Sequence, residues 1–352
     1  MPRSVLLACI LTMSLAGLAA AEPLHPGQVS AEAKWLVHFD ADAFRLSDAR
    51  RMSAFMDKSC QQWEEKCKAF FGRSEELRKA CRIFDVTTDL KGLTFYGMQF
   101  QRPEGVALVH GKFSEAVLTA LVEQVRRWPD YATSKHQSRQ LRTWMCGKGT
   151  ERAISITAVQ ARPDLLVLAT SVSAAGNALD VLDGAKPSIV GESILDAPTP
   201  AGELFVARAT GLAEANLPGD SPLVKLALTA STLAVDSQFS KDSPVIKDTA
   251  MLGVTIGEVV TEVFFTSQIV VQEGKNAESV KKAIDSHLDS ALYLVNDADL
   301  ADLVYHVTVE PQGKSFLLDV RGPADVGWNY VDKFVKKLLS QEKDRNEITP
   351  RK

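Results

Sequence analysis

Three polar side chains near the start of the chain could bind a metal ion. His38, Asp40 and Asp42 alternate with apolar residues in an extended stretch. In a strand, alternate side chains point to one face, so the three would converge. One imidazole and two carboxylates suit a divalent cation, and neighbouring carboxylates can also act as acid and base. A fourth ligand would come from His110 or His306. This pattern raises the hypothesis of a metal-dependent hydrolase.

The same stretch has a purely structural interpretation. Trp35, Val37 and Phe39 would form the buried face of a strand, and the opposite face would contact water. Asp40 or Asp42 would then cap the next turn through its carboxylate. The spacing of the residues fits both interpretations.

Other catalytic motifs are incomplete. Gly219-Asp220-Ser221 is followed by Pro222 and fits an ordinary helix start, with the serine before a first-turn proline. Ser279-Val280-Lys281-Lys282 matches a Ser-x-x-Lys pattern, but the Ser-Asp-Asn and Lys-Thr-Gly elements that accompany it in penicillin-recognising enzymes are absent from the sequence. The sequence therefore favours no specific catalytic class.

The N-terminus has the pattern of a secretory signal. A short basic start is followed by an apolar run over 5–18 and by small residues that end at Ala21. The run is shorter than the ~20 residues that a membrane-spanning helix needs. We expect cleavage near Ala21 and a periplasmic or secreted mature chain with no membrane span. Cleavage and acylation at Cys9 is the weaker alternative, because only a short apolar run precedes it.

Export changes how the cysteines are interpreted. Four remain after cleavage, and an even number in an oxidising compartment predicts two disulfides; the candidates are Cys60, Cys67, Cys81 and Cys146. Cys60 and Cys67 would lie about 10 Å apart on one helix, which is too far for a direct bond. Pairing of Cys81 with one of these two is favoured, and Cys146 would take the other. Free thiols remain an alternative.

Composition indicates a globular protein and gives no support for nucleic-acid binding. The chain of 352 residues has 40 Lys and Arg against 44 Asp and Glu, and 45% of its residues are hydrophobic. Such a chain can bury a core, and its slight acidity offers no attraction for a polyanion. Its length suits two domains.

Hydrophobic periodicity predicts an α+β fold of two similar modules. In the first, strands are expected over 34–39, 93–100, 106–113, 141–145, 154–160 and 165–170, with helices over 46–82, 114–128 and 173–182. In the second, strands are expected over 203–207, 232–239, 254–272, 304–309 and 315–320, with helices from 221, over 277–295 and over 325–339.

The repeated order predicts an internal duplication. The segment 154–182 corresponds to 305–339, and 94–100 to 232–239. Each module would be an antiparallel sheet with helices packed on one face. We expect a signal peptide over 1–21, a first module over 22–190 with a helical, cysteine-bearing insert over 44–90, a second module over 200–340 and a charged tail over 341–352, with the boundary in the Pro-rich stretch Pro187–Pro200.

Missing motifs and open sheet modules together favour binding over catalysis. The leading hypothesis from the sequence is an exported, non-catalytic protein that binds a partner protein or a small-molecule ligand in the envelope, without a cofactor. The metal-dependent hydrolase built on His38, Asp40 and Asp42 is the alternative, with a divalent metal as its cofactor.

Overall fold

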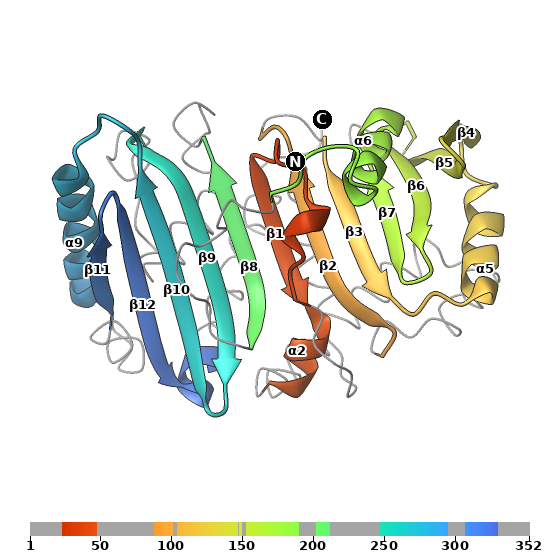
Figure 1. The fold of residues 1–352 in the computed structure, drawn as a ribbon. Coiled ribbons are helices and arrows are strands. Elements are labelled where there is room, and N and C mark those ends of the chain that lie inside the picture. The colour runs from red at the N-terminus through yellow and green to blue at the C-terminus, as the bar shows by residue number, and fades with distance from the viewer. Residues whose placement is uncertain are drawn as a thin grey trace.

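The structure is a computed structural model, and it describes residues 23–47, 88–100, 104–146, 148–149, 153–189, 202–211, 247–294 and 307–329. The predicted signal peptide, nearly all of the insert, the module boundary beyond 189, the strand over 232–239 and the charged tail lie outside these residues. The fold is α+β and centres on one large antiparallel sheet (Figure 1).

Helices separate runs of consecutive strands along the described chain. The first half contains η1 (Pro26–Gln28), β1 (Trp35–Asp40), α2 (Ala41–Leu46), β2 (Leu90–Gly97), β3 (Val106–Gly111), α5 (Glu115–Val125), β4 (Ala132–His136), β5 (Arg139–Cys146), β6 (Ile154–Arg162), β7 (Leu165–Ala169) and α6 (Val172–Leu182). The second contains β8 (Glu203–Thr210), β9 (Thr249–Val259), β10 (Glu262–Val271), α9 (Ala277–Leu294), β11 (Thr308–Gln312) and β12 (Ser315–Pro323). Residues 324–329 begin a further helix.

The two halves share one sheet. The order of the twelve described strands is β11-β12-β10-β9-β8-β1-β2-β3-β7-β6-β5-β4. Strands β1 and β8 pair antiparallel at the centre, with Trp35 opposite Ala209. From the centre outward, β1-β2-β3-β7-β6 on one side faces β8-β9-β10-β12-β11 on the other. Among the described strands, the hairpin β4–β5 of the first half has no counterpart in the second half.

Burial follows the position of a strand in this sheet. All six residues of β1, the central strand, are buried. At the edges, four of the five residues in both β4 and β11 are exposed. The expectation of a water-facing side for the first strand is therefore wrong, because β1 is covered on both faces.

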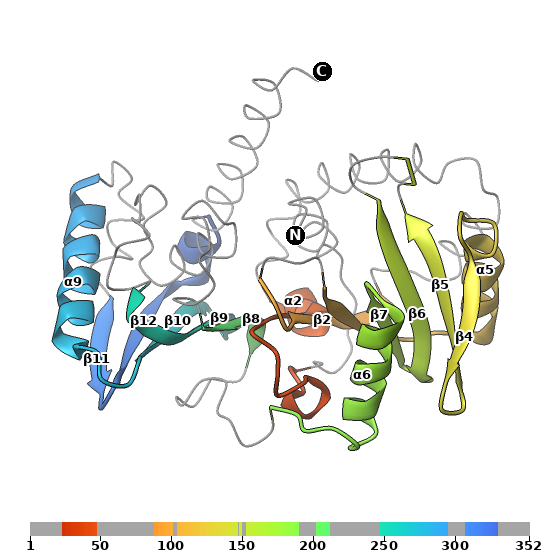
Figure 2. The same ribbon diagram turned by 90° about the horizontal axis from the view of Figure 1, so that it is seen from above.

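The shared sheet has helices on both of its faces. Leu36 and Tyr96 are paired neighbours and pack with α6 in one core cluster. Ala209, the partner of Trp35, packs with α9 in another. Consecutive residues such as Trp35 and Leu36 point to opposite faces. Helices α6 and α9, one from each half, therefore lie on opposite faces of the shared sheet (Figure 2).

Helix starts follow their capping residues. Ser114 accepts a hydrogen bond from the Val117 amide at the start of α5, and Ser171 does the same for Ala174 at the start of α6. A side-chain oxygen at this position satisfies an amide that has no partner within the helix. These caps confirm the predicted helix starts near Ser114 and Ser173.

Candidate functional site

The predicted metal ligands are deeply buried at the end of β1. His38 and Asp40 are each 2% exposed and Asp42 is fully buried. Asp42 lies in α2 and not in the strand, so the predicted alternation of all three along one strand ends at Asp40. The structure thus brings the three side chains into one region without placing them on one strand face.

Each of these side chains has a structural contact. His38 Nδ1 lies 2.9 Å from Thr94 Oγ1 on the neighbouring strand. Asp40 Oδ1 accepts a hydrogen bond of 2.7 Å from the Ala43 amide, which is the capping role that the structural interpretation predicts. Asp42 forms a buried ion pair with Arg45, whose guanidinium also donates to a backbone carbonyl of β2.

The described residues contain no group of three or more His, Cys, Asp or Glu side chains arranged to hold a metal ion. The nominated fourth ligand His110 packs against His25, with ring centroids 5.8 Å apart. His306 lies outside the described part of the chain. The metal site therefore stays a prediction.

Of the four candidate disulfide cysteines, only Cys146 is described. Its thiol is free and half-buried, and burial raises its pKa. Cys60, Cys67 and Cys81 lie outside the described residues, so the predicted pairing is untested.

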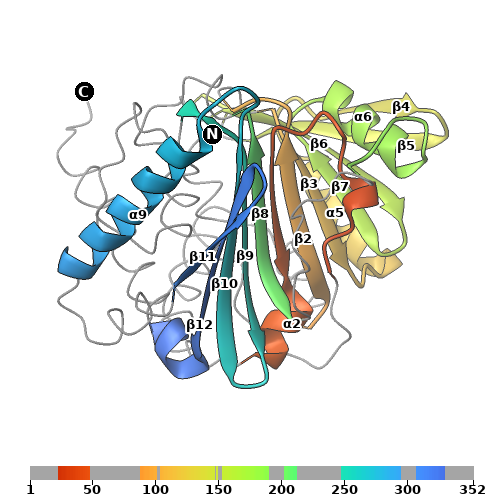
Figure 3. The same cartoon turned by 60° about the vertical axis from the view of Figure 1, so that its left-hand side comes forward.

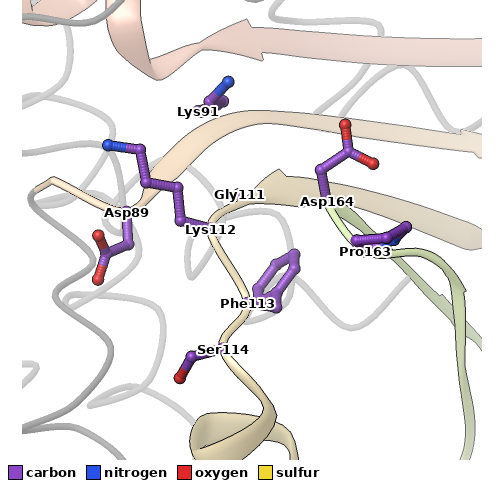
Figure 4. A pocket seen from close by; sticks show the side chains of 8 residues that line it. All are labelled: Asp89, Lys91, Gly111, Lys112, Phe113, Ser114, Pro163 and Asp164. Atoms are coloured by element: carbon purple, nitrogen blue, oxygen red, sulfur yellow. The ribbon is translucent and has the colours of Figure 1, made fainter.

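A second candidate site is an open hollow at one end of the first half. It has a volume of about 500 Å³ and lies where β2 begins, β3 ends and the β6–β7 turn closes. Figure 4 shows its side chains, which come from three distant stretches of the chain: Asp89, Lys91, Gly111, Lys112, Phe113, Ser114, Pro163 and Asp164. The volume is in the range of small-molecule sites.

Backbone hydrogen bonds hold this hollow together. The Gly111 amide donates to the Asp164 carbonyl at 3.0 Å, and the Lys112 amide donates to the Asp89 carbonyl at 2.8 Å. A Cβ at Gly111 would lie 2.8 Å from the Asp89 carbonyl oxygen and 3.1 Å from Phe113 Cζ. Glycine is therefore needed for the close approach of these segments.

The hollow carries charged side chains of both signs. In Figure 4, Lys112 and Asp89 lie on one side of Gly111, and Asp164 lies on the other. Within the described residues, no ion pair engages Lys91, Lys112 or Asp164. The arrangement can attract a carboxylate to the lysines and an ammonium group to Asp164. Phe113, which is half-buried between them, offers apolar surface.

The second half has a corner with the same backbone connections. The Val271 amide donates to the Lys314 carbonyl at 2.9 Å, and the Gln272 amide donates to the Asp248 carbonyl at 2.8 Å. Its charged side chains pair with each other instead. Lys275 Nζ lies 3.1 Å from Asp248 Oδ1, and Lys314 lies 3.6 Å from a carboxylate oxygen of Glu273.

Sequence reasoning missed the hollow. The turn at Arg162-Pro163-Asp164 and the segment from Lys112 to Ser114 were recognised only as strand and helix boundaries. Of the other motifs considered, Lys281 is paired with Asp285 at 2.7 Å, and the carboxylate raises the pKa of the lysine. The Gly219-Asp220-Ser221 segment is not described.

Comparisons with known proteins do not show a family for this chain. No protein-family model and no curated protein matches the chain. Crystal forms I and III of TP0453 are similar at a TM-score of 0.42 and 10% identity, covering 89% and 88% of this chain and 98% and 99% of those chains. This level of similarity carries no functional argument. In the part of the chain described, no helix is long and apolar enough to span a membrane.

Proposed function

We propose that the chain is an exported, non-catalytic binding protein whose first half takes a small zwitterionic ligand in the hollow beside Gly111. The main evidence is the difference in charge pairing between two corners with similar backbone connections. Lys91, Lys112 and Asp164 border a hollow without ion pairs among the described residues, whereas Lys275 and Lys314 are paired.

The ligand class follows from the charges and the apolar surface. Lys91 and Lys112 would bind a carboxylate, Asp164 an ammonium group, and Phe113 an apolar side chain between them. A short peptide or an amino acid with free charged ends has these groups. Opposite charges at both ends would fix the ligand's orientation.

An internal duplication would explain why the two corners have the same backbone connections. In support, the five strands from β1 outward and the five strands from β8 outward have the same order. Also in support, the amide bonds from Gly111 and Lys112 have counterparts from Val271 and Gln272. In this proposal the two modules retain a common backbone, and the first carries the ligand site.

The proposed location is the periplasm or the extracellular space. It is based on the N-terminal sequence, with a basic start, an apolar run and small residues before Glu22. Disulfides among the four remaining cysteines belong to the same proposal.

Titration calorimetry with the dipeptide Ala-Phe tests the ligand class. The dipeptide should bind the purified mature chain, and its N-acetylated and C-amidated forms should each bind at least about tenfold more weakly. Lys112→Ala should weaken binding of the free dipeptide by a similar factor.

The matched control is Lys275→Ala, which removes a lysine from the corresponding corner of the second half. It should leave binding unchanged. Absence of binding by the wild-type chain, or equal affinity of the wild type and Lys112→Ala for Ala-Phe, would contradict the proposed site.

The metal-dependent hydrolase remains a hypothesis from the sequence. The contacts of His38, Asp40 and Asp42 in the described residues are those of structural groups and do not favour it. Elemental analysis of the wild-type chain and His38→Ala tests it directly. Bound metal that falls on this substitution would support the hydrolase, and unchanged metal content would exclude this site.

A further inference from the structure

The turn between β9 and β10 exposes apolar side chains. Val259 and Glu262 are paired, so Val260 and Thr261 form a two-residue loop. Val260 is 88% exposed and Val259 is 41% exposed. Val260 also has a φ of 59°, which is an unfavourable conformation for a β-branched residue and one that glycine or asparagine adopts more easily.

Neither the backbone conformation nor the exposure of Val260 favours folding or solubility. Its backbone conformation costs free energy, and its side chain is in water. A residue with both costs is expected where it contacts something outside the chain. The other described residues with positive φ besides glycine are polar, namely Asp130 and Gln137.

The base of the loop is firmly held. Trp328 Nε1 donates to Glu258 Oε2 at 2.6 Å, and the Ala324 amide donates to the Thr261 carbonyl at 2.9 Å. On the other side, the Glu258 amide donates to the Gly202 carbonyl at 3.0 Å. The two valines are therefore presented on a rigid support, which lowers the entropy lost on binding.

A third exposed apolar side chain lies at the same end of the sheet. Helix α2 ends at Leu46, which is 55% exposed. Figures 1 and 3 both show α2 beside the β9–β10 turn, and Ala43 of α2 shares a core cluster with Val263 of β10. Of the four large apolar residues that are exposed in the described chain, only Val172 lies elsewhere.

The described charged side chains that flank the β9–β10 loop are acidic. Glu262 follows the loop directly, Asp325 lies in the first turn of the helix whose Ala324 amide binds the loop, and both are exposed. Glu258 is half-exposed beside Val259. An acidic rim disfavours the surface of an anionic membrane, which attracts basic segments. It complements a protein surface with lysine or arginine around an apolar socket.

We infer that the apolar tip, defined as Leu46, Val259 and Val260, docks into an apolar socket with a basic rim on a partner protein. The tip supplies the buried contact, and Glu262 and Asp325 supply the charged rim. This surface is distinct from the hollow beside Gly111, so the two proposals can fail separately.

Site-specific photo-crosslinking in the exporting host tests the tip. A benzophenone amino acid at position 260 of the full chain should give one discrete protein adduct, and the same group at position 172 should not. The double charge reversal Glu262→Lys with Asp325→Lys should lower the adduct yield about tenfold. An adduct that is absent, or that is unchanged by charge reversal, would overturn the inference.

A second variant separates docking from folding. Val260→Asn should raise the melting temperature, because asparagine tolerates the positive φ, and should also weaken binding of the purified partner about tenfold. Unchanged partner affinity would overturn the inference. Flotation of the wild-type chain with phosphatidylglycerol vesicles that is lost in Val260→Asn would also overturn it, in favour of a lipid surface.

Discussion

Two corners of the sheet share backbone connections and differ in their charged side chains. At the first, the Lys112 amide binds the Asp89 carbonyl beside a hollow, and at the second the Gln272 amide binds the Asp248 carbonyl. The second corner closes with the Lys275–Asp248 pair, and the first leaves Lys112 and Asp164 facing solvent. The same backbone connections therefore carry ion-paired side chains in one half and border an open hollow in the other.

The largest expected effect concerns the buried pair Asp42–Arg45 of the first half. Arg45→Ala leaves an uncompensated carboxylate, because both side chains are almost fully buried. We expect a loss of about 3–5 kcal/mol in the free energy of unfolding. Chemical denaturation measures it, with Lys281→Ala in the second half as the control. That control breaks a partly exposed pair and should leave the free energy of unfolding almost unchanged.

The next largest effect comes from placing a side chain at Gly111, because the corresponding residue of the second corner is Val271. Gly111→Ala introduces a Cβ that would lie 2.8 Å from the Asp89 carbonyl oxygen. The strands must shift, and we expect a loss of about 1–3 kcal/mol in unfolding free energy together with weaker dipeptide binding. Denaturation and calorimetry on the same variant measure both. A variant with wild-type stability and affinity would show that this close approach does not shape the hollow.

A smaller effect concerns the β4–β5 hairpin, which has no counterpart among the described strands of the second half. Arg139 donates two hydrogen bonds of 2.5 and 2.9 Å to Asp183 of the segment that ends α6, and His136 Nε2 lies 2.7 Å from Asp180 Oδ1. Arg139→Gln should cost about 0.5–1 kcal/mol, because the pair is partly exposed. Amide hydrogen exchange measures this loss, and exchange in β4 should be faster in Arg139→Gln than in the wild type.

This effect depends on pH with a defined sign. The hydrogen bond from Arg139 lowers the pKa of Asp183 in the folded chain. A lowered carboxyl pKa contributes stability above the unfolded value of about 3.9, and this contribution is lost as the pH falls through the folded pKa. The difference between wild type and Arg139→Gln should therefore shrink in acid. A constant difference across this range would contradict the assignment.

The smallest effect compares single lysines at the two corners. Lys275→Ala breaks an ion pair and should lower the unfolding free energy by up to about 0.5 kcal/mol. Lys112→Ala removes no described ion pair and should leave stability unchanged or slightly raised. Differential scanning calorimetry of both variants makes the comparison, and the reverse order would contradict the contrast in pairing.

Local sequence signals predicted individual elements better than their assembly. The strand from Trp35 and the cap at Ser114 were expected because apolar periodicity and a capping serine act within a few residues. The polar strand Ala132–His136 was missed because an exposed edge strand lacks an alternating apolar pattern. Its strand state depends on pairing with β5, which is a tertiary contact.

The sequence could not reveal how the halves join or where the hollow lies. Pairing of Trp35 with Ala209 is made by backbone groups, and these carry no signature in the side chains. This pairing buries His38 and Asp40, which the strand pattern alone left exposed to solvent in one interpretation. The hollow combines Asp89, Lys112 and Asp164 from three distant turns, so no local motif marks it.

Native mass spectrometry of the chain recovered from its exporting host tests the central claim most directly. We predict a mature chain that begins at Glu22 and retains one small zwitterionic ligand, and we predict that Lys112→Ala loses this ligand while Lys275→Ala keeps it. A ligand that Lys112→Ala retains, or a wild-type chain that carries only a divalent metal, would contradict the claim that the open corner of the first half is the binding site.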